Sequence, residues 1–545
     1  MPEHFDYVII GSGPAGSILA NRLTVDEGVR VCVLEAGPPD TNRYVRVPAG
    51  FVKLLHDPAV LWDFATEPGD AIAGRSLRLP QGRIVGGSSS INGLAYSRGQ
   101  AADFDDWAAA GNPGWASRDV LPYFMRSERR IGAADSRLRG RAGELPITDP
   151  DWPNALCEAF LRGAEASGIP RNADYNGERQ EGAGYFQRTV EHGRRISCAD
   201  AFLRPAIRRG RVDLRVRAHA DRLLFDARRA TGVRYRQQGE TRDVFARREV
   251  LVCAGTLNSP CLLQRSGIGD ASTLQALGVP VIVDSPGVGE NLRDHYTVRI
   301  AARARNAETI NELARGWRLG VEVAKWLVHR PSIIGLSPSL IHVFWKSDPS
   351  LTRGDLQVLF TPASYKTGRK YALEDFPGMS CGARQQRPFS AGHVRLRSAD
   401  PDVPPNVQPN YLADSRDGPV VVAGLKLARS LLNTDAMRPF LDAELVPGAA
   451  VQTDDEWLDF ARRNGSTAYH LVGTCRMGPD GDRFAVTDPQ LRVRGTSRLR
   501  VVDASVMPQV PSANTQAATM MLAERAADLI RGRAAPDARD GDRNY

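Results

Sequence analysis

The first 36 residues contain an apolar run, a glycine-rich turn and a second apolar run in immediate succession. Residues 5–10 predict a buried strand, and the turn that follows consists of Gly11, Ser12, Gly13, Pro14, Ala15 and Gly16. A Cβ at these glycines would block the close approach of the backbone to a pyrophosphate and of a helix to the sheet. The start of the helix after the turn offers unpaired N–H groups and a partial positive charge. We therefore expect a nucleotide-binding βαβ unit here.

An acidic residue ends this unit. The second apolar run covers residues 29–34 and is followed by Glu35, 19 residues after Gly16. A carboxylate at this place can accept a hydrogen bond from a ribose hydroxyl and would repel a 2′-phosphate. A glycine-rich turn alone is weak evidence, but strand, turn, helix, strand and acid all occur in order. The unit therefore predicts binding of a dinucleotide.

Composition limits the class of protein and its partners. The 545 residues allow two or more domains, and 42% hydrophobic with 25% charged residues is ordinary for a soluble globular chain. The net charge of +8 comes from scattered arginines without a nucleic-acid fold signature, so we expect no nucleic-acid partner. No window offers the roughly 18 to 20 apolar residues of a transmembrane segment. The first predicted strand leaves no room for a signal peptide, which predicts a cytoplasmic protein.

The seven cysteines show no CxxC pair and no metal-type spacing. An odd number without a secretion signal indicates reduced thiols. We assign none of them to catalysis and expect no metal site.

Further strand patterns predict how the first sheet is extended. Short alternating patterns at residues 213–225 and 231–244 lead into an apolar strand at 249–254, which suggests an antiparallel addition to a parallel sheet. Residues 305–450 carry no nucleotide signals and form the natural candidate for a substrate domain. A strand at 499–503 returns to the first sheet, and an amphipathic helix follows at 517–532. The nucleotide domain is therefore expected to be discontinuous.

Five further segments identify a family. They read GRIVGGSSSINGLAYSRG at 82–99, GTLNSPCLLQRSGIG at 255–269, GVGENLRDH at 287–295, YHLVGTCRMG at 469–478 and VVDASVMPQVPSANTQA at 501–517. With the N-terminal unit, they resemble the glucose–methanol–choline (GMC) family of FAD-dependent alcohol oxidoreductases, in its choline dehydrogenase-like branch. The resemblance covers essentially the whole chain apart from the middle stretch and the tail. It implies FAD rather than NAD.

The resemblance implies an α/β fold with two parts. One is an FAD-binding Rossmann-like domain with a parallel sheet, and the other is a smaller α+β substrate domain with an antiparallel sheet. We assign residues 1–155, 191–304 and 456–532 to the first and 305–455 to the second, with 156–190 as a substrate-domain or connecting segment. Residues 533–545 are polar, lack apolar periodicity and are expected to form a flexible tail.

The glycine- and serine-rich loop after residue 82 offers many N–H and O–H donors, which suit a pyrophosphate and the polar edge of a flavin. The resemblance assigns the flavin contacts to Arg83, Gly86, Gly87, Ser88, Asn92, Leu94 and Ala95. It assigns other cofactor contacts to Ala36, Ala220, Cys253, Ala254, Gly255, Asp503, Ala504, Asn514 and Thr515. Some choline-oxidising members bind FAD covalently through a histidine just before the asparagine of this loop. Ile91 occupies that position, so the FAD is expected to be noncovalent.

Two residues are candidates for catalysis. Oxidation of an alcohol removes a proton from oxygen and a hydride from carbon, so the protein must supply a base while flavin N5 takes the hydride. A histidine is largely neutral at pH 7 and suits this role. Of the nine histidines, His470 matches the catalytic histidine of the family. Asn514 matches its second active-site position, where an amide N–H can stabilise a developing alkoxide.

The sequence says less about the substrate. Choline enzymes of the family carry a glutamate where our alignment has Leu340, and the neighbouring Phe344, Trp345 and Phe360 are also apolar. These residues favour an uncharged alcohol. His342 is either a cavity contact or, as we prefer, a core residue, and His295 is left out of catalysis. A dehydrogenase is slightly favoured over an oxidase, although the electron acceptor is unknown. The alternative is a redox-neutral lyase of the hydroxynitrile lyase type.

Overall fold

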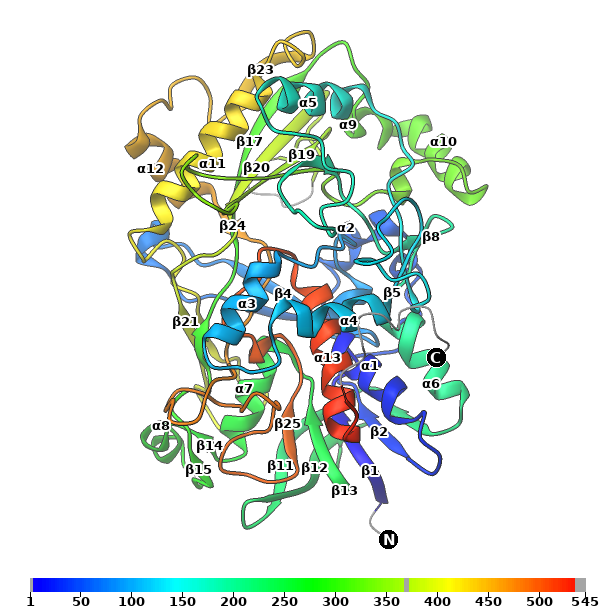
Figure 1. Cartoon of the computed structure of the whole chain (residues 1–545), viewed down its shortest axis with the longest axis vertical. Helices are drawn as coiled ribbons and strands as arrows, with labels where there is room; N and C mark the ends of the chain where they lie inside the picture. The colour runs from blue at the N-terminus through cyan, green and yellow to red at the C-terminus, as the bar shows by residue number, and fades with distance from the viewer. Residues whose placement is uncertain (1–2, 367–371, 535–545) are drawn as a thin grey trace.

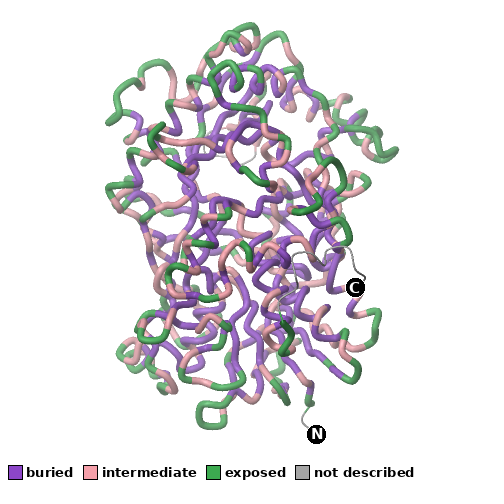
Figure 2. The backbone as a smooth tube through the Cα atoms, viewed as in Figure 1, coloured by how far each residue is buried: buried purple, intermediate pink, exposed green. Residues whose placement is uncertain are grey.

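The computed structural model describes residues 3–366 and 372–534. Two sheets lie at opposite ends of the molecule, with the first in the lower half of Figure 1 and the second in the upper half. Buried residues follow the strands of both halves, whereas the exposed ones concentrate in the outer loops (Figure 2). Each half therefore has its own core. The expected flexible tail falls mostly on residues 535–545, which lie outside the described residues.

The first sheet has seven strands. β1 (Glu3–Ile10) pairs in parallel with β2 (Val31–Leu34) and with β13 (Glu240–Val252). β10 (Val212–Arg215) extends the parallel part beside β2, and β25 (Leu499–Val501) extends it beside β13. β12 (Arg229–Gln237) and β11 (Ala218–Asp226) add an antiparallel edge. This arrangement is the predicted antiparallel extension of a parallel sheet.

A hairpin turn divides the segment that the sequence suggested as one strand over residues 231–244. Gln238 and Gly239 have φ values of 55° and 82°, so the chain reverses there between β12 and β13. A positive φ at both central residues matches the right-handed twist of the paired strands. β13 then continues unbroken to Val252, pairing first with β12 and then with β1. The end of the 231–244 pattern and most of the strand expected at 249–254 therefore belong to one strand, β13.

Helices cover the first sheet. α1 (Pro14–Leu23) packs against β1 and β2, and α13 (Thr515–Arg531) packs against α1 and α4 (Ser117–Ser127). α7 (Gly255–Arg265) begins three residues after β13 ends and packs against β11. The first and last helices of the described chain therefore lie side by side (Figure 1).

The second sheet is antiparallel. Its order is β23 (Leu441–Val446), β17 (Tyr296–Ala304), β20 (Gly378–Gln385), β19 (Leu356–Thr361), β18 (Ile341–Trp345) and β7 (Gly182–Tyr185), and β24 (Ser466–Thr467) also pairs with β17. α11 (Asp417–Leu432) packs against β17, β19 and β20, with α5 (Ala155–Ala166) and α12 (Asp454–Asn464) beside it. Because helices cover one face, alternate residues of β17 and β20 remain free to face the other half of the molecule.

The sheet boundaries differ from the expected division. β17 lies in residues 191–304, which were assigned to the FAD-binding domain, yet it is a central strand of the second sheet. The same sheet takes β24 from residues 456–532, whereas its strand β7 comes from residues 156–190, the segment expected to join or connect to the substrate domain. No motif marks these crossings, because pairing between distant strands leaves no local signal. The division of the chain into domains is therefore less regular than the motifs suggested.

Shorter elements make up the rest of the fold. A hairpin of β3 (Leu61–Ala65) and β4 (Arg78–Gly82) leads directly into the glycine-rich loop. The remaining helices and strands are α2 (Phe51–Leu54), α3 (Ala101–Ala109), β5 (Glu128–Arg130), β6 (Leu145–Ile147), β8 (Val190–Glu191), β9 (Arg194–Arg195), α6 (Arg204–Arg208), β14 (Ile268–Gly269), α8 (Ala271–Ala276), β15 (Val283–Asp284), β16 (Glu290–Leu292), α9 (Ile310–Leu313), α10 (Gly316–Leu327), β21 (Gly392–Arg395) and β22 (Asn406–Gln408). Within residues 3–366 and 372–534, none of the helices combines the length and apolar character that crossing a bilayer requires.

Candidate functional site

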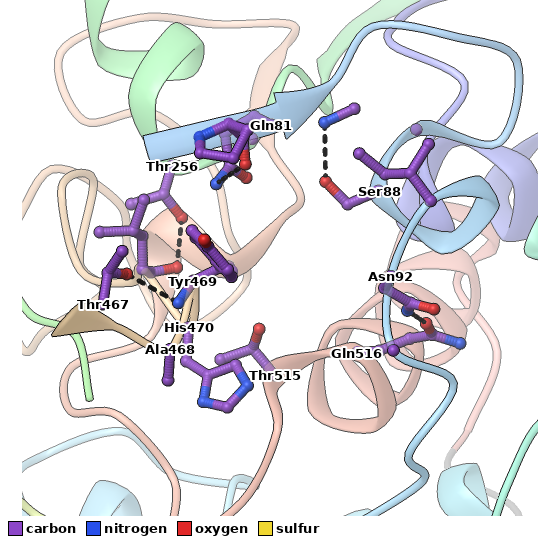
Figure 3. A pocket seen from close by; sticks show the side chains of 18 of the residues that line it. Gln81, Ser88, Asn92, Thr256, Thr467, Ala468, Tyr469, His470, Thr515 and Gln516 are labelled. Carbon is purple, nitrogen blue, oxygen red and sulfur yellow. Dashed lines mark hydrogen bonds between the residues drawn. The ribbon is translucent and has the colours of Figure 1, made fainter. Parts of the chain in front are cut away.

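A cavity of about 820 Å³ extends from the glycine-rich turn at the end of β1 to the free face of the second sheet. Its walls come from segments far apart in the sequence. In Figure 3, Ser88 and Asn92 of the glycine-rich loop lie on one side, and residues 467–470 lie on the other. Thr515 and Gln516, at the start of α13, lie between them. The fold therefore brings the N-terminal and C-terminal motifs into one site.

The turn after β1 leaves room for a ligand at Gly13. A Cβ on Gly16 would come within 1.9 Å of the carbonyl oxygen of Gly11, so Gly16 permits α1 to pack against the turn. A Cβ on Gly13, in contrast, would meet nothing nearer than Gly87 Cα at 4.0 Å, and Gly13 lines the cavity. No side chain caps the N-terminus of α1. The free N–H groups of its first turn therefore fit an anionic pyrophosphate.

Glu35 is fixed at the end of β2 by three donors. Ser12 donates from its backbone N and its hydroxyl to Glu35 Oε2 at 3.1 and 2.6 Å, and Gly37 N donates to Oε1 at 2.8 Å. Burial raises the pKa of this carboxyl above its usual range. Glu35 lines the cavity, and a carboxylate has further lone pairs that can accept a ribose hydroxyl.

Most of the predicted cofactor residues line this cavity. They are Gly11, Gly13, Pro14, Ala15, Glu35, Ala36, Gly87, Ser88, Asn92, Leu94, Ala95, Ala220, Cys253, Ala254, Gly255, Asp503, Ala504, Asn514 and Thr515. Their positions fit an extended dinucleotide that begins at α1 and ends near His470.

Four predicted cofactor residues lie outside the cavity lining. Ser12 donates to Glu35 and accepts from Gly86 N at 3.2 Å, so it ties the turn to the glycine-rich loop. Gly86, with a φ of 89°, turns that loop, and Gly16 lies behind the glycine-rich turn. The guanidinium of Arg83 lies 4.7 Å from the centre of the Trp62 ring. These residues support the wall of the cavity from behind and do not themselves line it.

The two predicted catalytic residues meet at the other end of the cavity. His470 Nε2 lies 2.9 Å from Asn514 Nδ2, and both residues line the cavity. Asn514 is the residue at which α13 starts, and His470 follows the short strand β24. The amide therefore donates one N–H to the histidine ring and keeps a second for another acceptor.

His295, which the sequence interpretation left out of catalysis, contacts His470 directly. The two Nδ1 atoms are 2.9 Å apart, and His295 Nε2 lies 2.7 Å from the carbonyl oxygen of Gln386. A carbonyl oxygen only accepts, so His295 carries its proton on Nε2 and offers a lone pair at Nδ1. His470 must then donate from Nδ1. This leaves a lone pair on His470 Nε2, at the cavity.

Charge and burial keep both histidines neutral. Burial, together with the nearby Arg384 and His295, lowers the pKa of His470 well below its usual 6.5. Burial and Arg384 lower the pKa of His295 to about 3. The guanidinium NH1 of Arg384 lies 3.3 Å from His470 Nδ1, and burial lowers the pKa of Arg384 to about 9, which leaves it protonated at neutral pH. The site therefore contains a neutral base beside a fixed positive charge.

Asp294 holds both histidines in place. It accepts from the backbone N of His470 at 2.7 Å, the backbone N of His295 at 2.8 Å, and the hydroxyls of Thr467 and Tyr411 at 2.5 Å each. Burial raises the pKa of Asp294 to about 6. Sequence reasoning missed Asp294 and Arg384. The segment that carries Asp294 was visible in the motif ENLRDH, whereas Arg384 lies on β20 outside any motif.

The residues from which an uncharged substrate was predicted do not line the cavity. Leu340, Trp345 and Phe360 pack in the core of the second half, and Phe344 packs with Tyr175 in a smaller cluster. His342 is a core residue, as preferred, enclosed by aromatic rings. The second sheet lines the cavity instead with residues of β17, β19 and β20, namely Thr297, Arg299, Ala301, Leu359, Ser380 and Arg384. The prediction of an uncharged substrate therefore loses its basis.

Known proteins resemble this chain over almost its whole length. Two family models described as GMC oxidoreductase match residues 5–297 and 388–523. An alcohol dehydrogenase [acceptor] of Pseudomonas putida is 38% identical, with 96% of this chain and 95% of that protein covered. The mitochondrial choline dehydrogenase of Homo sapiens is 38% identical, with coverage of 98% and 91%. The crystal structure of pyridoxine 4-oxidase from Mesorbium loti superimposes with a TM-score of 0.88 at 30% identity, covering 97% of this chain and 100% of that one.

The family resemblance predicted from the motifs is thus confirmed by sequence and by structure. The cavity, the glycine-rich cradle and the base at its far end fit the cofactor that this family uses. The chain belongs to the GMC oxidoreductase family, and it is an FAD-dependent enzyme that oxidises the CH–OH group of an alcohol.

Proposed function

We propose that His470 is the general base of this oxidation and that Asn514 holds the substrate oxygen. The observation that carries the proposal is the lone pair on His470 Nε2, which accepts an N–H of Asn514 at 2.9 Å where both residues line the cavity. A base with a hydrogen-bond donor beside it can take a proton from a hydroxyl and stabilise the oxygen that loses it.

The N-terminal half of the cavity suits noncovalent FAD. The first N–H groups of α1 would hold the pyrophosphate, and Glu35 would accept from the ribose. Ile91 lines the cavity where some relatives carry a linking histidine, and its side chain has no group that could form such a bond. Bound FAD supplies the acceptor for the hydride. The rest of the chemistry belongs to the side chains.

The proton step follows from the tautomer of His470. The alcohol O–H would take the place of the Asn514 N–H at Nε2, and its proton would move there as the C–H hydride departs, which leaves a carbonyl product. Negative charge that develops on the substrate oxygen would meet an N–H of Asn514, while Arg384 supplies a positive charge beside the other ring nitrogen of His470. A positioned general base contributes about 10²–10⁴-fold to such a rate.

A dehydrogenase with an acceptor other than oxygen is the form we favour. The relatives at 38% identity carry the names alcohol dehydrogenase [acceptor] and choline dehydrogenase, although some of the latter are named oxygen-dependent. The lyase alternative is not favoured, since these relatives and the solved pyridoxine 4-oxidase are named for redox reactions.

Anaerobic reduction of the flavin tests the proposal. We expect the purified protein to be yellow and an alcohol to bleach it, and we expect His470→Ala to stay yellow while its reduction slows at least about 10²-fold. His329→Ala, at an exposed histidine, serves as the control. The pKa of His470 lies well below 6.5, so the base is unprotonated at pH 6.5. We therefore expect the rate of flavin reduction to be the same at pH 6.5 as at neutral pH and to fall only when the pH approaches this lowered pKa.

Two outcomes would contradict the assignment. An enzyme that no alcohol bleaches is not the oxidoreductase described, and a colourless His470→Ala variant points to a structural role. Reoxidation of the reduced enzyme by air, rather than only by a dye, would replace the dehydrogenase with an oxidase.

A further inference from the structure

We infer that the alcohol substrate carries a carboxylate, which Arg299 and Arg384 bind at the second sheet. This inference rests on the proposed function, because it names the substrate class of the same site. It starts from the side chains that form the substrate end of the cavity.

Arg299 and Arg384 face the cavity from neighbouring strands. In the antiparallel pairing of β17 and β20, Thr297 lies opposite Arg384, and Arg299 lies opposite Gly382. Side chains alternate between the faces of a sheet, so residues 297, 299, 382 and 384 share one face. A Cβ on Gly382 would come within 3.2 Å of Arg299 Cγ. The missing side chain therefore gives the stem of Arg299 room beside the cavity that both arginines line.

Neither arginine has an ion-pair partner among the described residues. Arg384 is only 4% exposed, its Nε is buried without a hydrogen-bond partner, and its NH1 contacts only the ring of His470. Asp294 is close enough to influence its charge, but four other donors occupy that carboxylate. Thr297, opposite Arg384, also has a buried hydroxyl without a partner. Two residues that line the cavity on this face, Arg384 and Thr297, therefore carry buried donors without a partner, and the exposed Arg299 lies beside them.

Four other cations of the described chain line the cavity, and each has a partner. Arg463 pairs with Asp459 and Lys366 with Asp375, while Arg75 and Arg265 donate to backbone carbonyls. In the described part of the chain, the acids that line the cavity are Glu35 and Asp503, and both accept hydrogen bonds at the cofactor end. Arg299 and Arg384 are thus the cavity cations that have neither a carboxylate nor a backbone carbonyl as partner among the described residues.

A buried guanidinium without a counter-ion is costly, and an anion removes that cost. The pyrophosphate of FAD cannot be this anion, because its cradle is at the other end of the cavity, at α1. The planar fork of a guanidinium matches a carboxylate in two parallel hydrogen bonds. Since Arg384 is beside the base, the spacer between the carboxylate and the hydroxyl of the substrate must be no longer than a single aromatic ring.

A matched pair of alcohols tests the inference. We expect holoenzyme to oxidise 4-(hydroxymethyl)benzoate with a kcat/KM at least about tenfold above that for 4-(hydroxymethyl)benzamide. Arg299→Gln should lower kcat/KM for the benzoate at least about tenfold and change that for the amide less than about twofold. Arg303→Gln is the control. Its side chain is exposed on the same strand and lies outside the cavity, so neither substrate should be affected.

Direct binding separates this inference from the proposed function. Unreactive benzoate, titrated into the oxidised holoenzyme, should perturb the flavin absorbance, and its Kd should rise in Arg299→Gln but not in Arg303→Gln. If the amide is oxidised while benzoate neither binds nor inhibits, the inference is overturned and the proposed function stands. If no alcohol is oxidised, the proposed function fails, and the benzoate titration still decides the charge of the ligand. An equal loss for both substrates in Arg299→Gln would assign the arginine to the flavin or the fold and overturn the inference.

Discussion

At the scale of single residues, the chemistry of the site depends on which ring nitrogen of His470 carries the proton. The Gln386 carbonyl requires a proton on His295 Nε2, which turns His295 Nδ1 into an acceptor and places the His470 proton on Nδ1. Two backbone bonds to Asp294 hold both residues at this distance. His295 is thus a positioning residue, which acts on the substrate only through His470.

Replacing His295 should lower kcat and leave KM nearly unchanged. In His295→Phe, the His470 Nδ1–H loses its acceptor and the ring can adopt the wrong tautomer, so we expect the limiting rate of flavin reduction to fall about 10–100-fold. The KM should change little, because His295 is not in the cavity wall. Stopped-flow reduction across alcohol concentrations gives both values. An unchanged limiting rate would show that the tautomer of His470 is set elsewhere, and a loss of flavin would show a structural defect.

The sequence made His470 and Asn514 candidates because both lie in motifs, but it contained no signal for Arg384. That arginine reaches the base because β20 is in register with β17, and such pairing is not encoded locally. The fold also decided the role of the apolar residues from which an uncharged substrate was predicted, at positions 340, 344, 345 and 360. Their composition suits a cavity wall or a core equally well, and burial in the fold decided for the core.

At the scale of elements, the turn between β1 and α1 places two different demands on glycine. Gly16 has no room for a Cβ, because the Gly11 carbonyl lies 1.9 Å from where that atom would be. Gly13 has ordinary space and a φ of −63°, so the protein itself tolerates a side chain there. Only the ligand requires glycine at position 13. The sequence predicted this element well, because strand, turn and helix are contiguous and each has a local signal.

Alanine at these two glycines should therefore give opposite defects. We expect Gly13→Ala to fold with the melting temperature of the wild-type apoprotein but to bind FAD at least about tenfold more weakly, since the methyl group enters the pyrophosphate cradle. We expect Gly16→Ala to be unstable even without cofactor, since overpacking typically costs about 1–3 kcal/mol or more. Thermal unfolding of apoprotein, followed by FAD titration, distinguishes the two. Unaltered FAD affinity in Gly13→Ala would place the pyrophosphate elsewhere.

At the scale of the whole molecule, a buried ion-pair cluster links α13, near the C-terminal end of the described chain, to α1 and α4. Glu524 on α13 is fully buried and accepts from Arg22 on α1 at 2.8 Å and from Arg126 on α4 at 2.7 Å. Burial acts to raise the pKa of Glu524, but Arg22 and Arg126 outweigh it and hold the pKa below its usual 4.5. Sequence reasoning predicted that the last helix returns to the first domain. It could not predict this cluster, whose members lie 398 and 502 residues apart.

Removing the charge of Glu524 should destabilise this ion-pair cluster. Glu524→Gln removes one of the two carboxylates that each guanidinium contacts, because Arg22 also pairs with Glu144 and Arg126 with Asp528, so we expect the free energy of unfolding to fall by about 1–3 kcal/mol. The lowered pKa of Glu524 gives the sign of the pH dependence. The wild-type advantage is present above pH 4.5 and is lost as the pH falls through the lower pKa of the folded state. Urea unfolding at neutral and acidic pH measures both effects, with Asp480→Asn, at a carboxylate 96% exposed, as a control that should cost less than about 1 kcal/mol. Equal losses in the two variants would mean that the buried cluster contributes no more than a surface ion pair. Because α1 carries the pyrophosphate cradle at its other end, Glu524→Gln should also release FAD at a lower urea concentration than the wild-type protein does.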